Sequence, residues 1–300
     1  MAQEYRSLLD AMIRHVKDRR NRGEVYAPIT SAKWAAILES PPVRRRRSAL
    51  AAPVVDAAAS PPGSAVTAAA ADLLPAEAGS PLADLLAKVR GASTVEQAAE
   101  ILGRGAAGCA RCPNLARTRR NVVLGVGDLH AELMFVGEAP GMEEDEQGEP
   151  FVGRAGQLLT RIIETMGFTR QTVYIANVLK CRPDTPGQAT GNRKPTADEM
   201  RTCLPYLLSQ IDLIRPRVLV ALGATAVEGL LGQAVMITRF RGRFQDFRGI
   251  PLMPTYHPSY LLRNQSLAVK RQVWEDMLQV LEKLGRPISA KQRGYFLKSS

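Results

Sequence analysis

Residues 133–141 read Leu-Met-Phe-Val-Gly-Glu-Ala-Pro-Gly, a short apolar run that ends in a turn rich in glycine and proline. Short apolar runs bounded by turn residues are typical of buried strands. The turn exposes backbone N–H groups, which can hold an anion or a carbonyl oxygen. We therefore predict a strand at 133–137 that opens into a candidate binding turn at 137–141. The alternative interpretation is an ordinary strand-to-helix loop with solvated acidic residues.

Strand and helix patterns alternate on the carboxyl side of this stretch. Strand patterns recur at 173–177, 218–222 and 250–255, and helix patterns at 157–166, 196–214 and 267–284. The alternation predicts a three-layer α/β/α fold with a central, mainly parallel sheet of four strands. The two prolines of the last strand favour an edge position. Ligands bind at the carboxyl ends of such strands, which indicates the turn after 137, the segment from Asn177 and the loop after 255.

The chain before this sheet divides by composition. Residues 1–40 form a predicted helical segment of unknown role, which could bind a repair or replication partner. Residues 41–80 predict a disordered linker rich in Ala and Pro, because 12 of the residues 51–80 are alanine and little can be buried. Residues 81–104 predict a helical lead-in broken at Gly91. The main domain is expected at 105–285, followed by a basic tail at 286–300.

The charge distribution favours a polyanionic partner. The net charge is +11, and residues 101–300 alone hold 27 Lys and Arg against 18 Asp and Glu. A basic folded region suits nucleic acid, although a merely soluble basic surface is an equally good interpretation of charge alone. No run approaches the ~20 apolar residues of a membrane helix. We expect a monomer in the cytoplasm, associated with the nucleoid in a prokaryote, with no membrane partner.

Four side chains near the strand ends could bind a planar ligand. Phe151 follows Pro150 in a glycine-rich helix entry and could stack on a base. Asn177 ends a strand and offers a donor and an acceptor in one plane, which suits a pyrimidine edge. His257 follows the last strand and could donate to a leaving-group oxygen. Leu261 could act as an apolar wedge in a base stack. The alternatives are a core Phe, a turn-forming Asn and a core Leu.

The cysteines indicate a metal or cluster site. Cys109 and Cys112 form a C-x-x-C motif, and Cys181 and Cys203 follow after gaps of 68 and 21 residues. Four thiolates suit zinc or an iron–sulfur cluster, and their spacing does not choose between the two.

Taken together, the motifs resemble the type 4, iron–sulfur branch of the uracil-DNA glycosylase superfamily. The resemblance covers about residues 105–285 and rests on five blocks in the same order. These read CARC, FVGEAPGMEEDEQGEPFVGRAGQLL, VYIANVLKCRP, GNRKPTADEMRTC and MPTYHPSYLLR. The resemblance implies a four-stranded parallel sheet between helices and a structural [4Fe-4S] cluster on the four cysteines. It also implies uracil-containing DNA, single- or double-stranded, as the partner.

The resemblance also implies roles for single residues. Uracil and the attacking water would contact the turn that contains Gly137, Glu138, Ala139 and Gly141. Phe151 would stack on the flipped base, and Asn177 would read the edge of that base. His257 would hydrogen-bond the uracil O2. Leu261 would fill the space that the base leaves. DNA contacts would come from Arg193, Lys194 and Arg263.

One departure from the superfamily concerns water activation. The best-known branch has Asp where this chain has Ala139. The role must then fall to a neighbour, Glu138 first and Glu144 second, with Asp145 as a further candidate. The expected activity is monofunctional removal of uracil, the first step of base excision repair. The alternatives are a glycosylase for other deaminated bases such as hypoxanthine and xanthine, a protein that binds uracil-DNA without turnover, and a zinc-stabilised scaffold.

Overall fold

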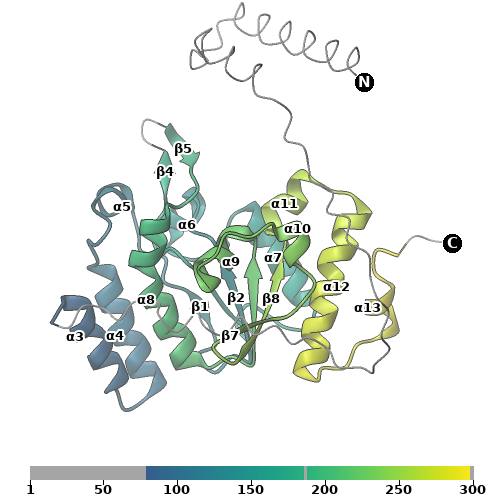
Figure 1. Cartoon of the computed structure of the whole chain (residues 1–300), viewed down its shortest axis with the longest axis horizontal. Helices are drawn as coiled ribbons and strands as arrows, with labels where there is room; N and C mark the ends of the chain where they lie inside the picture. Colours follow the sequence, from purple (N-terminus) through teal and green to yellow (C-terminus); the bar gives the residue numbers. More distant parts are fainter. Residues whose placement is uncertain (1–78, 186–187, 298–300) are drawn as a thin grey trace, which may run out of the picture. The chain divides into compact units, whose positions relative to one another are not determined.

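The computed structural model describes residues 79–185 and 188–297 (Figure 1). The predicted N-terminal helical segment and nearly all of the predicted linker lie outside the described residues. None of the helices in the described part is long and apolar enough to cross a membrane.

The centre of the fold is a six-stranded sheet in the order β1-β3-β2-β6-β8-β7. Its four inner strands are parallel: β3 (Tyr174–Asn177), β2 (Leu133–Gly137), β6 (Val218–Leu222) and β8 (Ile250–Thr255). The predicted parallel sheet of four strands is confirmed. Two short antiparallel strands extend it at its edges, β1 (Val126–Gly127) and β7 (Gln245–Phe247).

The predicted edge position of β8 is wrong, because β7 covers that edge. Pro251 and Pro254 are nevertheless accommodated. The short β7 pairs only with residues 250–252, so that Pro254 lies beyond its end. A proline lacks only the N–H, and the Pro254 carbonyl still accepts a hydrogen bond from Gly242 N at 3.4 Å.

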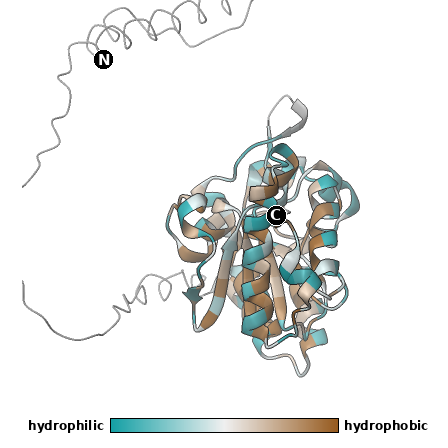
Figure 2. Cartoon of the chain, turned by 90° about the vertical axis from the view of Figure 1, so that its right-hand side faces the viewer, coloured by the Kyte–Doolittle hydropathy of each residue, from teal (hydrophilic) through white to brown (hydrophobic). Residues whose placement is uncertain are grey.

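Alternate residues of the inner strands face two different helical layers, as the two-residue period of a strand requires. Met134 and Val136 pack with α8 (Ala197–Ile214) and α9 (Ala224–Leu231). Leu133 and Phe135 pack on the other face. That face is covered by α7 (Arg154–Thr165) and α12 (Leu267–Leu284). The helices that face the viewer in Figure 2 carry hydrophilic and hydrophobic residues on different sides, as a layer over a sheet requires.

The remaining elements surround these layers. The lead-in forms α3 (Pro81–Arg90) and α4 (Val95–Ala107), and Gly91 caps α3, which confirms the predicted break. The shorter elements are α5 (Pro113–Thr118), α6 (Met142–Gln147), the hairpin of β4 (Asp184–Thr185) and β5 (Gln188–Asn192), α10 (Ile237–Phe240), α11 (Pro258–Arg263) and α13 (Ala290–Gly294). A capping box formed by Thr196 and Glu199 is present at the start of α8.

The register of the sheet brings the predicted loops to one edge. Gly137 pairs with Asn177 across β2 and β3, and Leu222 pairs with Thr255 across β6 and β8. The carboxyl ends of all four parallel strands therefore lie side by side, and the segments that leave them share one space.

Candidate active site

A cavity of about 640 Å³ opens at this edge of the sheet. Its walls include Glu138, Ala139, Phe151, Asn177 and His257, which we call the pocket floor. Three predicted DNA contacts, Arg193, Lys194 and Arg263, also line it and are called the pocket rim. The structure thus brings most of the predicted site residues together from loops far apart in the sequence.

Gly137 lies beneath the pocket floor and leaves room for two floor side chains. A Cβ placed on Gly137 would lie 2.3 Å from Asn177 Oδ1 and 2.4 Å from Phe151 Cζ. Both distances are far below van der Waals contact, so any side chain here would displace the amide and the ring. Glycine at 137 is therefore a condition for the shape of the pocket.

Asn177 presents an unsatisfied polar atom to the cavity. The residue is 1% exposed, and its Oδ1 is the one fully buried side-chain oxygen or nitrogen without a hydrogen-bond partner in the part of the chain that the structure describes. A buried polar atom without a partner is costly, and such atoms are rare in native proteins. The backbone around Asn177 is held firmly, because its carbonyl accepts a hydrogen bond from Lys180 Nζ at 2.8 Å. The amide is thus fixed in place with capacity left for a ligand.

Phe151 forms the wall next to His257. Its ring is 6% exposed, and its centroid lies 5.7 Å from that of the imidazole. Its backbone is left-handed, with φ at 56°, a conformation that residues with a side chain seldom adopt. Strain of this kind is found where surrounding contacts hold the chain in place.

The tautomer of His257 follows from its hydrogen bonds. Nδ1 accepts a hydrogen bond from the backbone N–H of Ser259 at 3.1 Å and lies 2.8 Å from Ser259 Oγ. A backbone N–H can only donate, so Nδ1 carries no proton in this arrangement and Nε2 must carry it. Burial, helped by the nearby cation of Arg263, lowers the pKa of His257 to about 4. The ring is neutral near pH 7 and has one N–H to donate.

The two candidate acids differ in their partners. Glu144 Oε2 accepts a hydrogen bond from Gly141 N, and Oε1 accepts from Val152 N and Gly153 N, each at 3.0 Å. The carboxylate of Glu138 has no hydrogen bond or ion pair within residues 79–185 and 188–297, and it lines the cavity. Glu144 therefore ties two loops together, whereas Glu138 is available to a water molecule.

Asp145, the third candidate acid, points away from the cavity. It is 3% exposed, and its carboxylate accepts from the backbone N–H groups of Arg120 and Asn121. Asp145 does not line the pocket. Its contacts are those of a residue that anchors the preceding loop.

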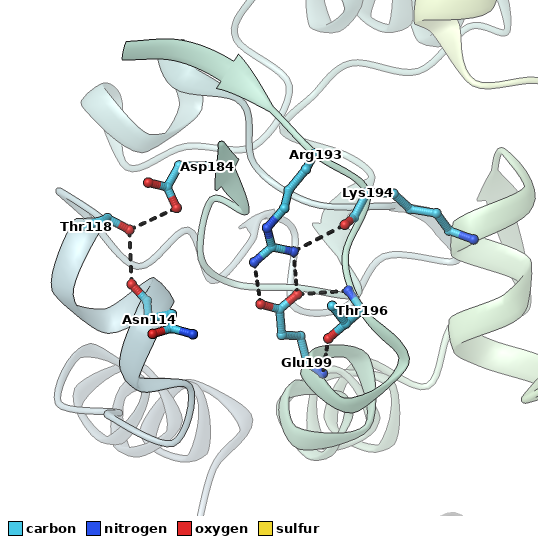
Figure 3. A network of polar contacts seen from close by, with 7 residues as sticks. All are labelled: Asn114, Thr118, Asp184, Arg193, Lys194, Thr196 and Glu199. Carbon is cyan, nitrogen blue, oxygen red and sulfur yellow. Dashed lines mark hydrogen bonds and ion pairs between the residues drawn. The ribbon is translucent and has the colours of Figure 1, made fainter. Parts of the chain in front are cut away.

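The cations of the rim are not equivalent. Arg193 binds Glu199 through both Nη atoms, at 2.8 and 2.5 Å, as Figure 3 shows. Lys194 Nζ donates to Glu228 at 2.7 Å. Arg263 is exposed and has no ion pair with any described residue. Of the three predicted DNA contacts, Arg263 is therefore the one that can bind a phosphate without first releasing a carboxylate.

Leu261 is not part of this pocket. It is 6% exposed and packs with Tyr256 and Val273, where it lines a second, mostly apolar cavity of about 510 Å³. The helical period of α11 turns Leu261 toward the core and leaves its neighbour Leu262 partly exposed. The wedge role in a base stack stays a prediction, and it would require Leu261 to leave these contacts.

The four cysteines are reduced and influence one another. Burial, followed by the neighbouring Cys181 and Cys109, raises the pKa of Cys112 to about 11, and burial raises the pKa of Cys203 to about 12. Two sulfurs accept N–H···S hydrogen bonds at 3.2 Å, Cys181 from Arg119 Nη1 and Cys203 from the backbone of Lys180. The thiols therefore gather in one region next to the end of β3.

Among the described residues, no three His, Cys, Asp or Glu side chains are placed to hold a metal ion. A zinc ion bonds each sulfur at about 2.3 Å and so needs its four ligands close together. A larger cluster spreads its thiolates further apart, and its sulfurs accept N–H donors of the kind seen here.

Several residues near the site escaped the sequence analysis. Asn192 lines the pocket, and its Oδ1 accepts a hydrogen bond from Arg182 Nε at 2.7 Å. Lys180 is 2% exposed and donates to Asn177 O and to Gln210 Oε1 at 2.5 Å. A lysine inside the apolar run after 173 could have indicated a buried network. No pattern in the sequence marks Asn192.

Comparison with known proteins agrees with the geometry. The model of the uracil DNA glycosylase superfamily matches residues 124–278. The chain is 48% identical over 186 residues to a type-4 uracil-DNA glycosylase of Thermotoga maritima, covering 61% of this chain and 93% of the relative. It is 38% identical over 196 residues to the enzyme of that name from Archaeoglobus fulgidus, covering 63% and 92%. These matches, and a pocket whose parts come from the same blocks, show that the chain belongs to the type 4 branch of the uracil-DNA glycosylase superfamily.

Proposed function

We propose that the protein is a monofunctional uracil-DNA glycosylase that begins base excision repair. In the reaction the bond between uracil N1 and deoxyribose C1′ breaks, and a water oxygen forms a new bond to C1′. The base leaves with the bonding electron pair, and the proton lost by water passes to a carboxylate. The observation that carries the proposal is the unpartnered amide oxygen of Asn177, buried beside Phe151 and His257 at the cavity.

The pocket floor suits a flipped pyrimidine. Asn177 Oδ1 can accept from uracil N3–H while its Nδ2 donates to O4, a pattern that the amino group and bare N3 of cytosine do not match. The Phe151 ring supplies a flat apolar face for stacking. A base must leave the helix to reach such a site.

His257 is suited to stabilise the departing base. Its neutral ring holds a proton on Nε2, because Ser259 occupies Nδ1. Charge develops on uracil O2 as the glycosidic bond breaks, and a fixed N–H donor lowers the free energy of that charge. The low pKa of about 4 keeps His257 a neutral donor and not a general acid.

Glu138 is the proposed residue for water. It is half-buried at the pocket, and its carboxylate is free of partners among the described residues. A negative charge here can orient water and stabilise the positive charge that develops on the sugar. The geometry favours Glu138 over Glu144, since three backbone N–H groups already occupy most of the acceptor sites of the Glu144 carboxylate.

Cys109, Cys112, Cys181 and Cys203 would hold a [4Fe-4S] cluster. This assignment is supported by the four free thiols in one region and by the N–H groups that donate to two of their sulfurs. The cluster would serve as a structural crosslink between α8, the end of β3 and the segment before α5. Hydrolysis of a glycosidic bond involves no electron transfer, and no step of the reaction requires one.

DNA would lie across the pocket rim. Arg263 offers an unpaired cation there, and Lys194 and Arg193 could exchange their carboxylate partners for phosphates. Such contacts position DNA without reading sequence. A chromosomal substrate places the enzyme in the cytoplasm of a prokaryote.

Release assays on a lesion panel test the proposal. Oligonucleotides that each carry one uracil, hypoxanthine, xanthine or cytosine are incubated with the wild-type holoenzyme and with Glu138→Gln. We expect fast release of uracil by the wild type only and an intact abasic strand. Release of hypoxanthine or xanthine without uracil would overturn the assignment, and a DNA adduct that survives denaturation would indicate binding without turnover.

The cluster has its own test. Protein purified without oxygen should be brown, with broad visible absorption and about four irons per chain. A colourless preparation that contains only zinc would overturn the assignment. Cys203→Ser should lose iron and unfold at a lower temperature.

A further inference from the structure

The loop that carries Phe151 is held in an unfavourable conformation. It connects α6 to α7, and Phe151 itself has φ at 56°. The backbone packs directly on the first turn of α7, because a Cβ on Gly156 would lie 1.8 Å from the Phe151 carbonyl oxygen. An L-residue leaves the left-handed region when nothing holds it there. The loop therefore requires contacts that keep it in place.

Arg170 supplies such contacts from outside the pocket. It lies between α7 and β3, and its Nη2 donates to Pro150 O at 2.7 Å. Its Nη1 donates to Phe151 O at 3.0 Å and to Thr160 Oγ1 at 3.4 Å. A guanidinium fork can bind two successive carbonyls at once, and a lysine ammonium cannot reproduce that planar geometry.

The other side of the loop is held by Glu144. Its Oε1 accepts from Val152 N and Gly153 N, the two N–H groups that follow Phe151. Its Oε2 accepts from Gly141 N in the turn after β2. The carbonyls of Pro150 and Phe151 thus accept from the cation of Arg170. The next two N–H groups along the chain donate to the carboxylate of Glu144. Phe151 lies between the two clamps.

We propose that Arg170 is a positioning residue for base stacking, which acts by holding Phe151 in its left-handed conformation. The inference rests on the proposed function, since it assigns the ring to stacking on the flipped base. Arg170 is absent from the pocket lining, and among the described residues of the pocket floor its hydrogen bond is to the Phe151 carbonyl. Its entire effect on excision should therefore pass through Phe151.

Single-turnover excision of uracil by the holoenzyme tests this claim. Arg170→Ala should slow excision by roughly 10- to 100-fold, because small misplacements of a substrate-positioning group have effects of that size. Arg170→Lys should fall between this variant and the wild type. Guanidinium ion at sub-denaturing concentration should restore part of the rate to Arg170→Ala and none to Arg170→Lys. The matched control is Arg161→Ala, an exposed arginine on α7 that has no hydrogen bond to the loop among the described residues and should keep the wild-type rate.

A double-mutant cycle separates positioning from general destabilisation. In a Phe151→Ala background, Arg170→Ala should change the rate by less than about threefold, since residues that act as one unit are not additive. The inference would be overturned if Arg170→Ala slowed excision in the Phe151→Ala background as much as it does in the wild type. A wild-type excision rate in Arg170→Ala alone would overturn it as well. These outcomes differ from failure of the proposed function, in which the wild type itself would release no uracil.

Discussion

The floor and the rim of the pocket follow different rules. Floor residues such as Asn177 and His257 sit at strand ends, and their ligand-facing atoms have no hydrogen-bond partner among the described residues. The rim residues Arg193 and Lys194 follow the β4–β5 hairpin on the connection to α8, and both are already paired with carboxylates. The difference indicates that the floor residues are already positioned to bind a ligand in the free protein. At Arg193 and Lys194, by contrast, DNA phosphates must compete with the carboxylates that bind these cations.

The largest expected effect distinguishes Glu138, in the turn after β2, from Glu144, in the first turn of α6. Glu138→Gln should slow single-turnover excision by about 10²- to 10⁴-fold, the usual range for loss of a general base. Glu144→Gln should mainly lower the melting temperature, because its oxygens hold three backbone N–H groups. Glu164→Gln, an exposed acid on α7, is the matched control. If Glu144→Gln were the only severe variant, the assignment of Glu138 would be wrong.

The next effect concerns the donor on the floor. His257→Ala should slow excision by about 10²- to 10³-fold, as removal of a single oxyanion donor does in other enzymes. Because the pKa of His257 is about 4, the wild-type rate should show no inflection near pH 6.5. An inflection there that disappears in His257→Ala would contradict a neutral donor.

The same pKa shift predicts a stability change. The folded pKa of about 4 lies below the ordinary value of 6.5, so the unfolded chain binds the proton more tightly between these values. The stability contributed by neutral His257 is present above pH 6.5 and is lost as the pH falls toward 4. As the pH falls through this window, the melting temperature of the wild type should drop more than that of His257→Ala.

The smallest effect concerns the rim. Arg263→Ala should weaken DNA binding severalfold and reduce the slope of log affinity against log salt by about 0.7 on single strands, as loss of one phosphate contact does. Arg193→Ala should change the slope less, because its charge is already balanced by Glu199. Equal slope changes would show that Arg193 exchanges its partner on binding, and would weaken the contrast between floor and rim.

The parts that could be predicted from sequence are those governed by backbone periodicity. Strands of four to six residues stand out by their apolar runs, and their carboxyl ends locate Gly137, Asn177 and His257 without any knowledge of side-chain partners. β1 and β7 have only two and three residues, too few to show a period, so the sheet was expected to have four strands.

The parts that could not be predicted depend on contacts between distant residues. Arg193 meets Glu199, which the sequence marks only as a capping residue. Leu261 and Leu262 are adjacent, and only the orientation of α11 decides which of them is buried. The hydrogen bond of Glu144 to the backbone could have been expected, because a glutamate three residues after the Gly141 N-cap is typical of a helix start.

The most direct test of the central claim is single-turnover release of uracil by Asn177→Ala, with folding checked by thermal melting. If the unpartnered amide reads the base, release should fall by about 100-fold or more, because buried groups built to hydrogen-bond a ligand discriminate strongly. The melting temperature should stay the same or rise, since an unsatisfied buried oxygen is removed. Release at the wild-type rate by folded Asn177→Ala would contradict the account.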